Sequence, residues 1–99
     1  MTYGDFVKVP AGATWIIETS LADSGHAERK KYQSNEMEWK YVIQALIPHL
    51  DETRKHELRF TPRVGDKLQK LLELGYTRIQ VTRNTEEGAK VDYEFKGLE

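Results

Sequence analysis

Hydrophobic and polar residues alternate in three stretches of the chain, so that apolar side chains fall on every second position. These stretches are residues 56–61, 77–83 and 89–96. Such alternation is typical of β-strands with one buried face. Residues 14–19 are mostly β-branched or aromatic, which also favours a strand. A short apolar run at residues 5–9 is stopped by a proline, and we expect it to pair with residues 14–19 as a hairpin.

Two other stretches repeat their apolar residues at the spacing of an α-helix. Residues 36–47 carry them at positions i, i+3, i+4, i+7 and i+8, which predicts a helix with one apolar stripe. Residues 63–74 show a similar stripe. Thr61 and Pro62 supply an N-cap and a proline at the first helical position, and Gly75 favours a helix end.

The polar segment 20–35 has neither period, and we therefore expect a long, mobile loop. Together these patterns predict a single α+β domain over residues 1–99. It is a two-layer sandwich with two helices packed on one face of a mainly antiparallel sheet, in the order β-β-α-β-α-β-β. The predicted core consists of Trp15, Ile17, Trp39, Val42, Ile43, Leu46, Leu58, Phe60, Val64, Leu68, Leu71, Ile79, Val81, Val91, Tyr93 and Phe95.

Composition excludes several kinds of chemistry. The chain has no cysteine, so disulfides, thiolate catalysis and cysteine-bound metals are excluded. No apolar run approaches the ~20 residues of a membrane span, so we expect a soluble, cytoplasmic protein without a membrane partner. His49, Asp51, Glu52 and His56 are ligand types, but their spacing matches no metal motif. We therefore expect no enzymatic activity, no metal and no cofactor.

Net charge is −1, from 15 basic and 16 acidic residues, but the charges are unevenly distributed. Basic residues gather around the start of the predicted second helix, where free backbone amides also favour anions. These residues are Lys55, Arg59, Arg63, Lys67 and Lys70. They form a candidate site for nucleic-acid phosphates, and the competing interpretation is a solvated helix edge.

Four apolar residues lie outside the predicted core pattern. Met37 and Tyr41 fall on the side of the first predicted helix that faces away from its stripe, and Ile16 points away from Trp15 and Ile17. Met and Tyr are enriched at protein interfaces, although segment 20–35, which includes Tyr32, is an alternative cover for them.

The first functional hypothesis is therefore a small non-enzymatic binding module that contacts a protein, either a second copy or another chain. By analogy of size alone, it would be a regulator or inhibitor of the kind that phages and mobile elements encode. The alternative is nucleic-acid binding through the basic edge of the second helix.

Overall fold

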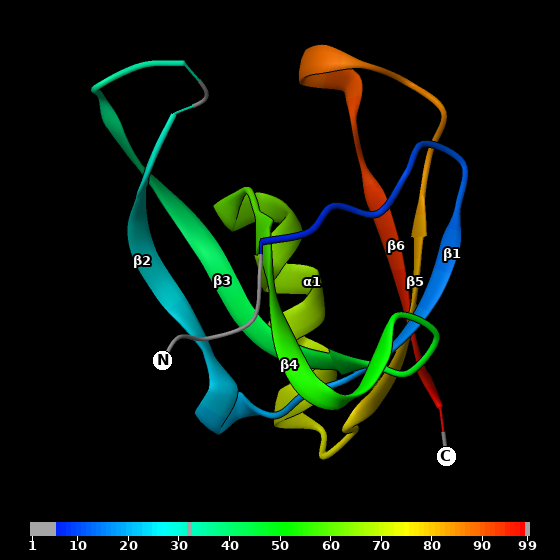
Figure 1. Ribbon diagram of the computed structural model, residues 1–99. Helices are drawn as coiled ribbons and strands as arrows, with labels where there is room; N and C mark the ends of the chain where they lie inside the picture. Colours follow the sequence, from blue (N-terminus) through cyan, green and yellow to red (C-terminus); the bar gives the residue numbers. More distant parts are fainter. Residues whose placement is uncertain (1–5, 32, 99) are drawn as a thin grey trace.

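The computed structural model describes residues 6–31 and 33–98. In these residues, six strands form a curled antiparallel sheet, and one α-helix packs against it (Figure 1). In chain order the elements are β1 (Thr14–Glu18), the 3-10 turn η1 (Leu21–Asp23), β2 (Ser24–Lys30), β3 (Met37–Ile47), β4 (Asp51–Phe60), α1 (Pro62–Glu73), β5 (Arg78–Arg83), the 3-10 turn η2 (Gly88–Lys90) and β6 (Tyr93–Leu98).

Strand β3 organises the sheet because it is long enough to pair with three other strands. Its first half pairs with β2, its second half pairs with β4, and Leu46 lies opposite Glu18 of β1. Strand β1 then pairs with β5, and β5 with β6. The strands of the sheet follow the order β2-β3-β1-β5-β6, and β4 pairs with β3 outside this path; β4 and β6 each pair with one strand of the described residues and so form ends of the sheet.

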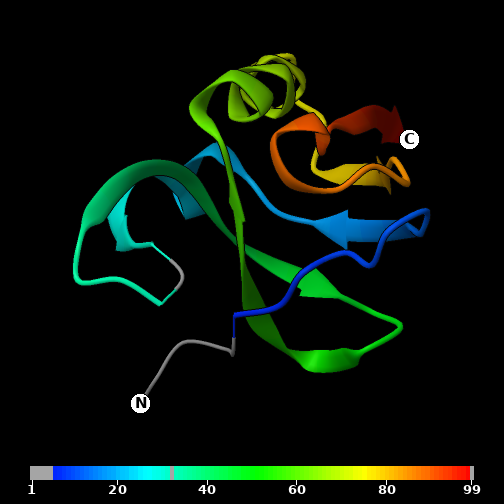
Figure 2. The same ribbon diagram turned by 90° about the horizontal axis from the view of Figure 1, so that it is seen from above.

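The sheet curls until its two ends approach each other. The Phe60 ring of β4 packs edge-on against Tyr93 and Phe95 of β6, with ring centroids 4.9 and 5.4 Å apart. We call this contact between β4 and β6 the seam. Seen from above, α1 covers one end of the curled sheet (Figure 2).

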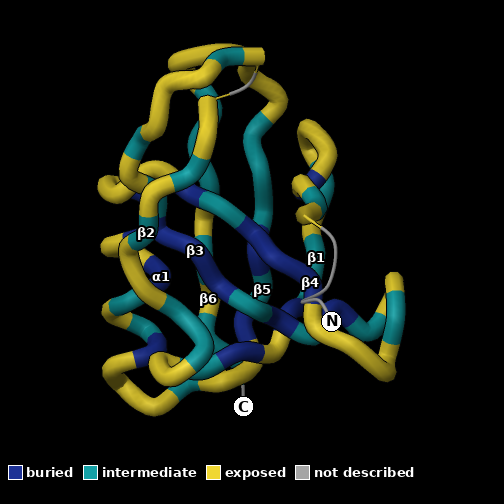
Figure 3. The backbone as a smooth tube through the Cα atoms, turned by 60° about the vertical axis from the view of Figure 1, so that its left-hand side comes forward, coloured by how far each residue is buried: buried dark blue, intermediate teal, exposed yellow. Residues whose placement is uncertain are grey.

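The core lies inside the curl, where the buried stretches of β3, β4, β5 and α1 face one another (Figure 3). Alternate residues of β3 supply Tyr41, Ile43, Ala45 and Ile47 to this core. The helix contributes a stripe that consists of Val64, Leu68 and Leu72. Burial of these side chains is the main stabilising contribution to the fold.

The prediction of a helix at residues 63–74 is confirmed, and its local signals act as expected. The Thr61 hydroxyl accepts a hydrogen bond from the Val64 amide at 3.4 Å, and Pro62 begins the helix. Gly75 ends it with a φ of +100°, a conformation that favours glycine. Gly65 lets the helix approach β3, because a Cβ at this position would lie 2.2 Å from the Cβ of Tyr41.

The prediction of a helix at residues 36–47 is wrong, and with it the two-helix sandwich. This segment is strand β3. Its odd positions from Met37 to Ile47 are all apolar, which is the period of a strand. Val42 is buried on the opposite face of the strand, at 7% exposure. Together with Trp39, Ile43 and Ile47 it reproduces the spacing of a helical stripe, and this spacing led to the wrong prediction. Trp39, which we expected in the core, is 59% exposed.

The predicted loop at residues 20–35 and the predicted N-terminal hairpin are also wrong. Residues 24–30 form the edge strand β2, held to β3 by main-chain pairing that needs no apolar pattern. Residue 5 lies outside the described residues. Phe6 makes an isolated parallel bridge with Glu57 rather than a hairpin with β1. The predicted last strand, residues 89–96, begins later, at Tyr93.

Candidate functional site

A cavity of about 840 Å³ lies between the β2–β3 hairpin, the β5–β6 hairpin and the start of α1. In Figure 1 these two hairpins are the arms that diverge at the top of the molecule. We call this space the seam cavity because it opens beside the contact between β4 and β6. Its apolar wall consists of Leu58, Phe60, Val64, Val91 and Tyr93, among others.

Residues 6–9 form another wall of the seam cavity, crossing from β4 towards the β1–β5 side (Figure 1). The Val7 amide donates a hydrogen bond to the Glu57 carbonyl oxygen at 3.0 Å. At the other end, the Arg83 Nη1 donates to the Val9 carbonyl oxygen, also at 3.0 Å. The Val9 side chain is buried in the core, so this segment is held at both ends.

Basic residues dominate the charged part of the lining. Seven of them line the cavity, from six separate segments of the chain: Lys8, Arg29, Lys30, Lys40, Arg59, Arg63 and Arg83. Glu38 is the single acidic residue of the lining among the described residues. A concave surface with this imbalance concentrates anions.

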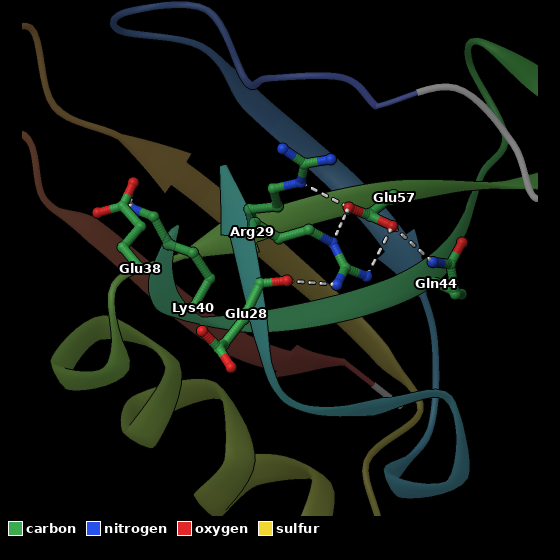
Figure 4. Close-up of polar contacts among 7 residues, drawn as sticks. Glu28, Arg29, Glu38, Lys40, Gln44 and Glu57 are labelled. Atoms are coloured by element: carbon green, nitrogen blue, oxygen red, sulfur yellow. Dashed lines mark hydrogen bonds and ion pairs between the residues drawn. The ribbon is translucent and has the colours of Figure 1, made fainter. Parts of the chain in front are cut away.

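The Glu57 carboxylate holds two of these arginines in place (Figure 4). It accepts a hydrogen bond from the Arg29 Nε at 3.1 Å, another from the Arg59 Nε, and a third from the Gln44 Nε2 at 3.1 Å. Burial by itself raises the Glu57 pKa, but the bonds from Arg29 and Arg59 outweigh it and leave the pKa below its ordinary value. Glu57 is therefore charged, and it holds Arg29 and Arg59 in place in the cavity lining.

Arg59 also stacks on an aromatic ring at the cavity. Its guanidinium carbon lies 4.0 Å from the centroid of the Phe6 ring, within cation–π range. Phe6 is itself 42% exposed. The ring and guanidinium together offer planar, partly exposed surfaces beside the cationic groups.

Several cationic side chains of the lining keep unused donor capacity. Lys8, Lys30 and Arg63 form no ion pair with a carboxylate in residues 6–31 and 33–98. The Arg83 side chain is only 14% exposed, and its Nη2 lies 3.7 Å from the exposed carboxylate of Glu87. Its buried Nε has no hydrogen-bond partner within the described part of the chain. Counted with Glu38 and with Glu57 and Glu87, the carboxylates that pair with lining arginines, the seven basic residues give this region a net charge of +4.

The residues predicted to bind nucleic acid do not form one continuous edge. Arg59 and Arg63 both line the seam cavity, whereas Lys55, Lys67 and Lys70 do not. The Lys55 Nζ pairs with Asp23 at 2.8 Å, and the Lys67 Nζ pairs with Asp92 at 3.2 Å. Lys70 is exposed in the last turn of α1.

The residues predicted to bind a protein are also separated. Tyr41 is 1% exposed and its hydroxyl donates to Ser24 Oγ at 2.9 Å, so the expectation that it lies on the surface is wrong. Met37 is 51% exposed and Ile16 is half-buried. Tyr32 lies outside the described residues. Trp39, which the sequence assigned to the core, is exposed on the same strand face as Met37.

Sequence reasoning missed five of the seven basic residues of the cavity. They are Lys8, Arg29, Lys30, Lys40 and Arg83. They belong to four segments of the chain and show no common spacing. The one local signal was the basic run Arg29-Lys30-Lys31 in the segment that we expected to be a loop.

No helix in the described residues is long and apolar enough to cross a membrane. The same residues contain no group of three or more His, Asp or Glu side chains placed to hold a metal ion.

In comparisons with protein-family models, curated proteins and solved structures, nothing matches this chain.

Proposed function

We propose that this protein is a non-enzymatic binding module that holds a single-stranded nucleic acid in the seam cavity. The observation that carries this proposal is the lining of seven basic residues and one acidic residue around an apolar wall. Single-strand binding sites combine a positively charged groove with aromatic side chains on which bases stack. A cytoplasmic location is part of the proposal, and the cysteine-free sequence supports it.

The cations of the cavity suit phosphate groups. Arg63 stands in the first turn of α1, where the positive end of the helix dipole adds to its charge. Lys8 lines the same cavity from the N-terminal segment. Phe6, whose ring centroid lies 4.0 Å from the Arg59 guanidinium carbon and 6.0 Å from the Lys8 Nζ, provides a partly exposed aromatic ring that a base can contact beside these cations. This arrangement replaces the basic edge of α1 as the candidate nucleic-acid site.

Fluorescence anisotropy with labelled single-stranded DNA and RNA at low salt tests the proposal. We expect the double variant Lys8→Ala, Arg63→Ala to weaken binding about tenfold or more, because it removes two charge-assisted contacts. Each lost phosphate contact should also flatten the log–log dependence on salt by about 0.7.

The matched control is Lys55→Ala, Lys67→Ala, which changes the charge equally but removes two lysines that pair with carboxylates outside the cavity. It should bind nearly as the wild type does. Absence of wild-type binding at about 100 µM protein, the weak end of non-specific binding, would reject the proposal. An equal loss in both double variants would reject the cavity as the site.

A second candidate function, contact with a protein, is favoured by the exposure of Trp39 and Met37. Both side chains project from one face of β3, beside β2. Strand β2 pairs only with β3 in the described residues, so its outer edge is open to another strand. We take a second copy of the chain as the partner to test, with a regulator or inhibitor role as the corresponding function.

Sedimentation velocity over a range of concentrations measures this self-association. Trp39→Ser should weaken it, because a large exposed aromatic side chain is a typical interface anchor. Leu74→Ser is the control, since Leu74 is 75% exposed at the end of α1. A wild-type chain that stays monomeric at every concentration would remove the second copy as the partner.

A further inference from the structure

We infer that the seam cavity takes a nucleoside phosphomonoester, the terminal nucleotide of a strand or a free mononucleotide, rather than a continuous stretch of backbone. This inference rests on the proposed function and deepens it. Three features of the cavity lead to it: its size, the distribution of charge over the whole chain, and the place of Arg83.

The first feature is size. At about 840 Å³, the cavity falls within the range of about 300–1,000 Å³ that is typical of small-molecule sites. The segment of residues 6–9 is bonded at both ends and forms one wall, while α1 and the two hairpins form the others. Such a space fits one nucleotide better than a strand that enters and leaves.

The second feature is charge outside the cavity. The cavity region, with its seven basic and three acidic residues, has a net charge of +4. In the rest of the described chain, eight basic and 11 acidic residues leave a net charge of −3. A long backbone lying across the protein would therefore meet repulsion away from the cavity. A strand that inserts only its terminal nucleotide into the cavity avoids most of this repulsion.

The third feature is Arg83, whose side chain is more shielded than those of Arg59 and Arg29 in the same lining. Its side chain is 14% exposed, against 26% for Arg59 and 32% for Arg29. A guanidinium carries five N–H donors: the Arg83 Nη1 is bonded to the Val9 carbonyl oxygen, and Nη2 lies 3.7 Å from the exposed Glu87 carboxylate, which can turn to solvent when a phosphate binds. A shielded cation with spare donors favours a doubly charged group. A phosphomonoester carries about −1.5 to −2 charges at pH 7, whereas each internal phosphodiester carries one.

The test compares three forms of one labelled single-stranded oligonucleotide: one with a 5′-phosphate, one with a 3′-phosphate, and one with hydroxyl groups at both ends. We expect one phosphorylated form to bind at least about tenfold more tightly than the hydroxyl form, a difference equivalent to one strong charge-assisted contact. Unlabelled nucleoside monophosphate is then added as a competitor. Efficient competition identifies a free mononucleotide as the ligand, whereas weak competition identifies the strand end.

The variant Arg83→Gln should reduce the preference for the phosphorylated form towards unity. Arg78→Gln is the control, because Arg78 is an exposed arginine on the same strand, β5. Since Arg83 also bonds to Val9, Arg83→Lys and a thermal midpoint for each variant separate lost charge from lost folding.

Equal binding of all three oligonucleotides would overturn this inference and leave the proposed function standing. Failure of every oligonucleotide to bind would reject both. An unchanged phosphate preference in folded Arg83→Gln would reject the assignment of Arg83 as the residue that recognises the monoester.

Discussion

At the scale of single residues, Glu57 fixes the position of two basic residues of the seam cavity. Its side chain is 11% exposed and joins Arg29 and Arg59, which come from different strands. Two guanidinium groups that share one carboxylate would repel each other without it. Burying a charge is costly unless it is paired and hydrogen-bonded, and here all three charges are bonded.

We predict that Glu57→Gln lowers the free energy of unfolding by about 1–3 kcal/mol at pH 7, because it weakens charge-assisted hydrogen bonds to Arg29 and Arg59, whose side chains are 32% and 26% exposed and can be hydrated. Because the Glu57 pKa is lower in the folded state than its ordinary value of 4.5, its charge stabilises the fold fully above that pH. This contribution is lost as the pH falls through the folded-state pKa. Urea unfolding at pH 7 and at about pH 3 should therefore show a larger acid loss in the wild type than in the variant.

Glu38→Gln is the control for this prediction. Glu38 pairs with Lys40 at 3.7 Å, and its side chain is 34% exposed, so the pair should contribute about 1 kcal/mol at most. Wild-type stability of Glu57→Gln at pH 7 would mean that the two arginines do not depend on this carboxylate.

At the scale of elements, α1 packs on β3 through Gly65. Because of this contact, replacing Gly65 with alanine should have the opposite effect on stability from the one that helix propensity predicts. Alanine is a better helix former than glycine by about 1 kcal/mol. The added methyl group, however, would lie 2.2 Å from the Cβ of Tyr41. We therefore predict that Gly65→Ala destabilises the protein by about 1–3 kcal/mol, as overpacking does.

Thermal and urea unfolding of Gly65→Ala measure this effect. Gly25→Ala in β2 is the matched control, because a Cβ there has nothing within 4 Å. It should be neutral or slightly stabilising, since alanine restricts the unfolded chain more than glycine does. Stabilisation by Gly65→Ala would show that α1 does not approach β3 this closely.

At the scale of the whole molecule, the curl of the sheet depends on the seam. Phe60 is 2% exposed and touches rings on β6 that are more than thirty residues away in the chain. We predict that Phe60→Ala costs about 3–5 kcal/mol, because it leaves a void where the two ends of the sheet meet. Urea unfolding measures the loss.

Phe6→Ala is the control for the seam, because Phe6 also lines the cavity but is partly exposed. It loses the cation–π contacts with Arg59 and, at 6.0 Å, with Lys8, both at an exposed site, and should cost about 1 kcal/mol. Equal costs for Phe60→Ala and Phe6→Ala would contradict closure of the sheet by Phe60.

The sequence by itself determined the elements whose signals are local. Thr61 and Pro62 predicted where α1 begins, and Gly75 predicted where it ends. The alternation in residues 77–83 predicted strand β5. These signals succeed because caps, turns and one-sided burial depend on neighbouring residues in the chain.

Only the tertiary structure decided between helix and strand for residues 37–47, and only it assembled the candidate site. In β3 the apolar residues fit both periods, and pairing with β2 and β4 selected the strand. The edge strand β2 is held by main-chain bonds to β3, which leave no side-chain pattern. The seam cavity gathers cations from Lys8 to Arg83. Contacts between segments so far apart arise from how the sheet curls, and residue spacing along a chain does not record that curl.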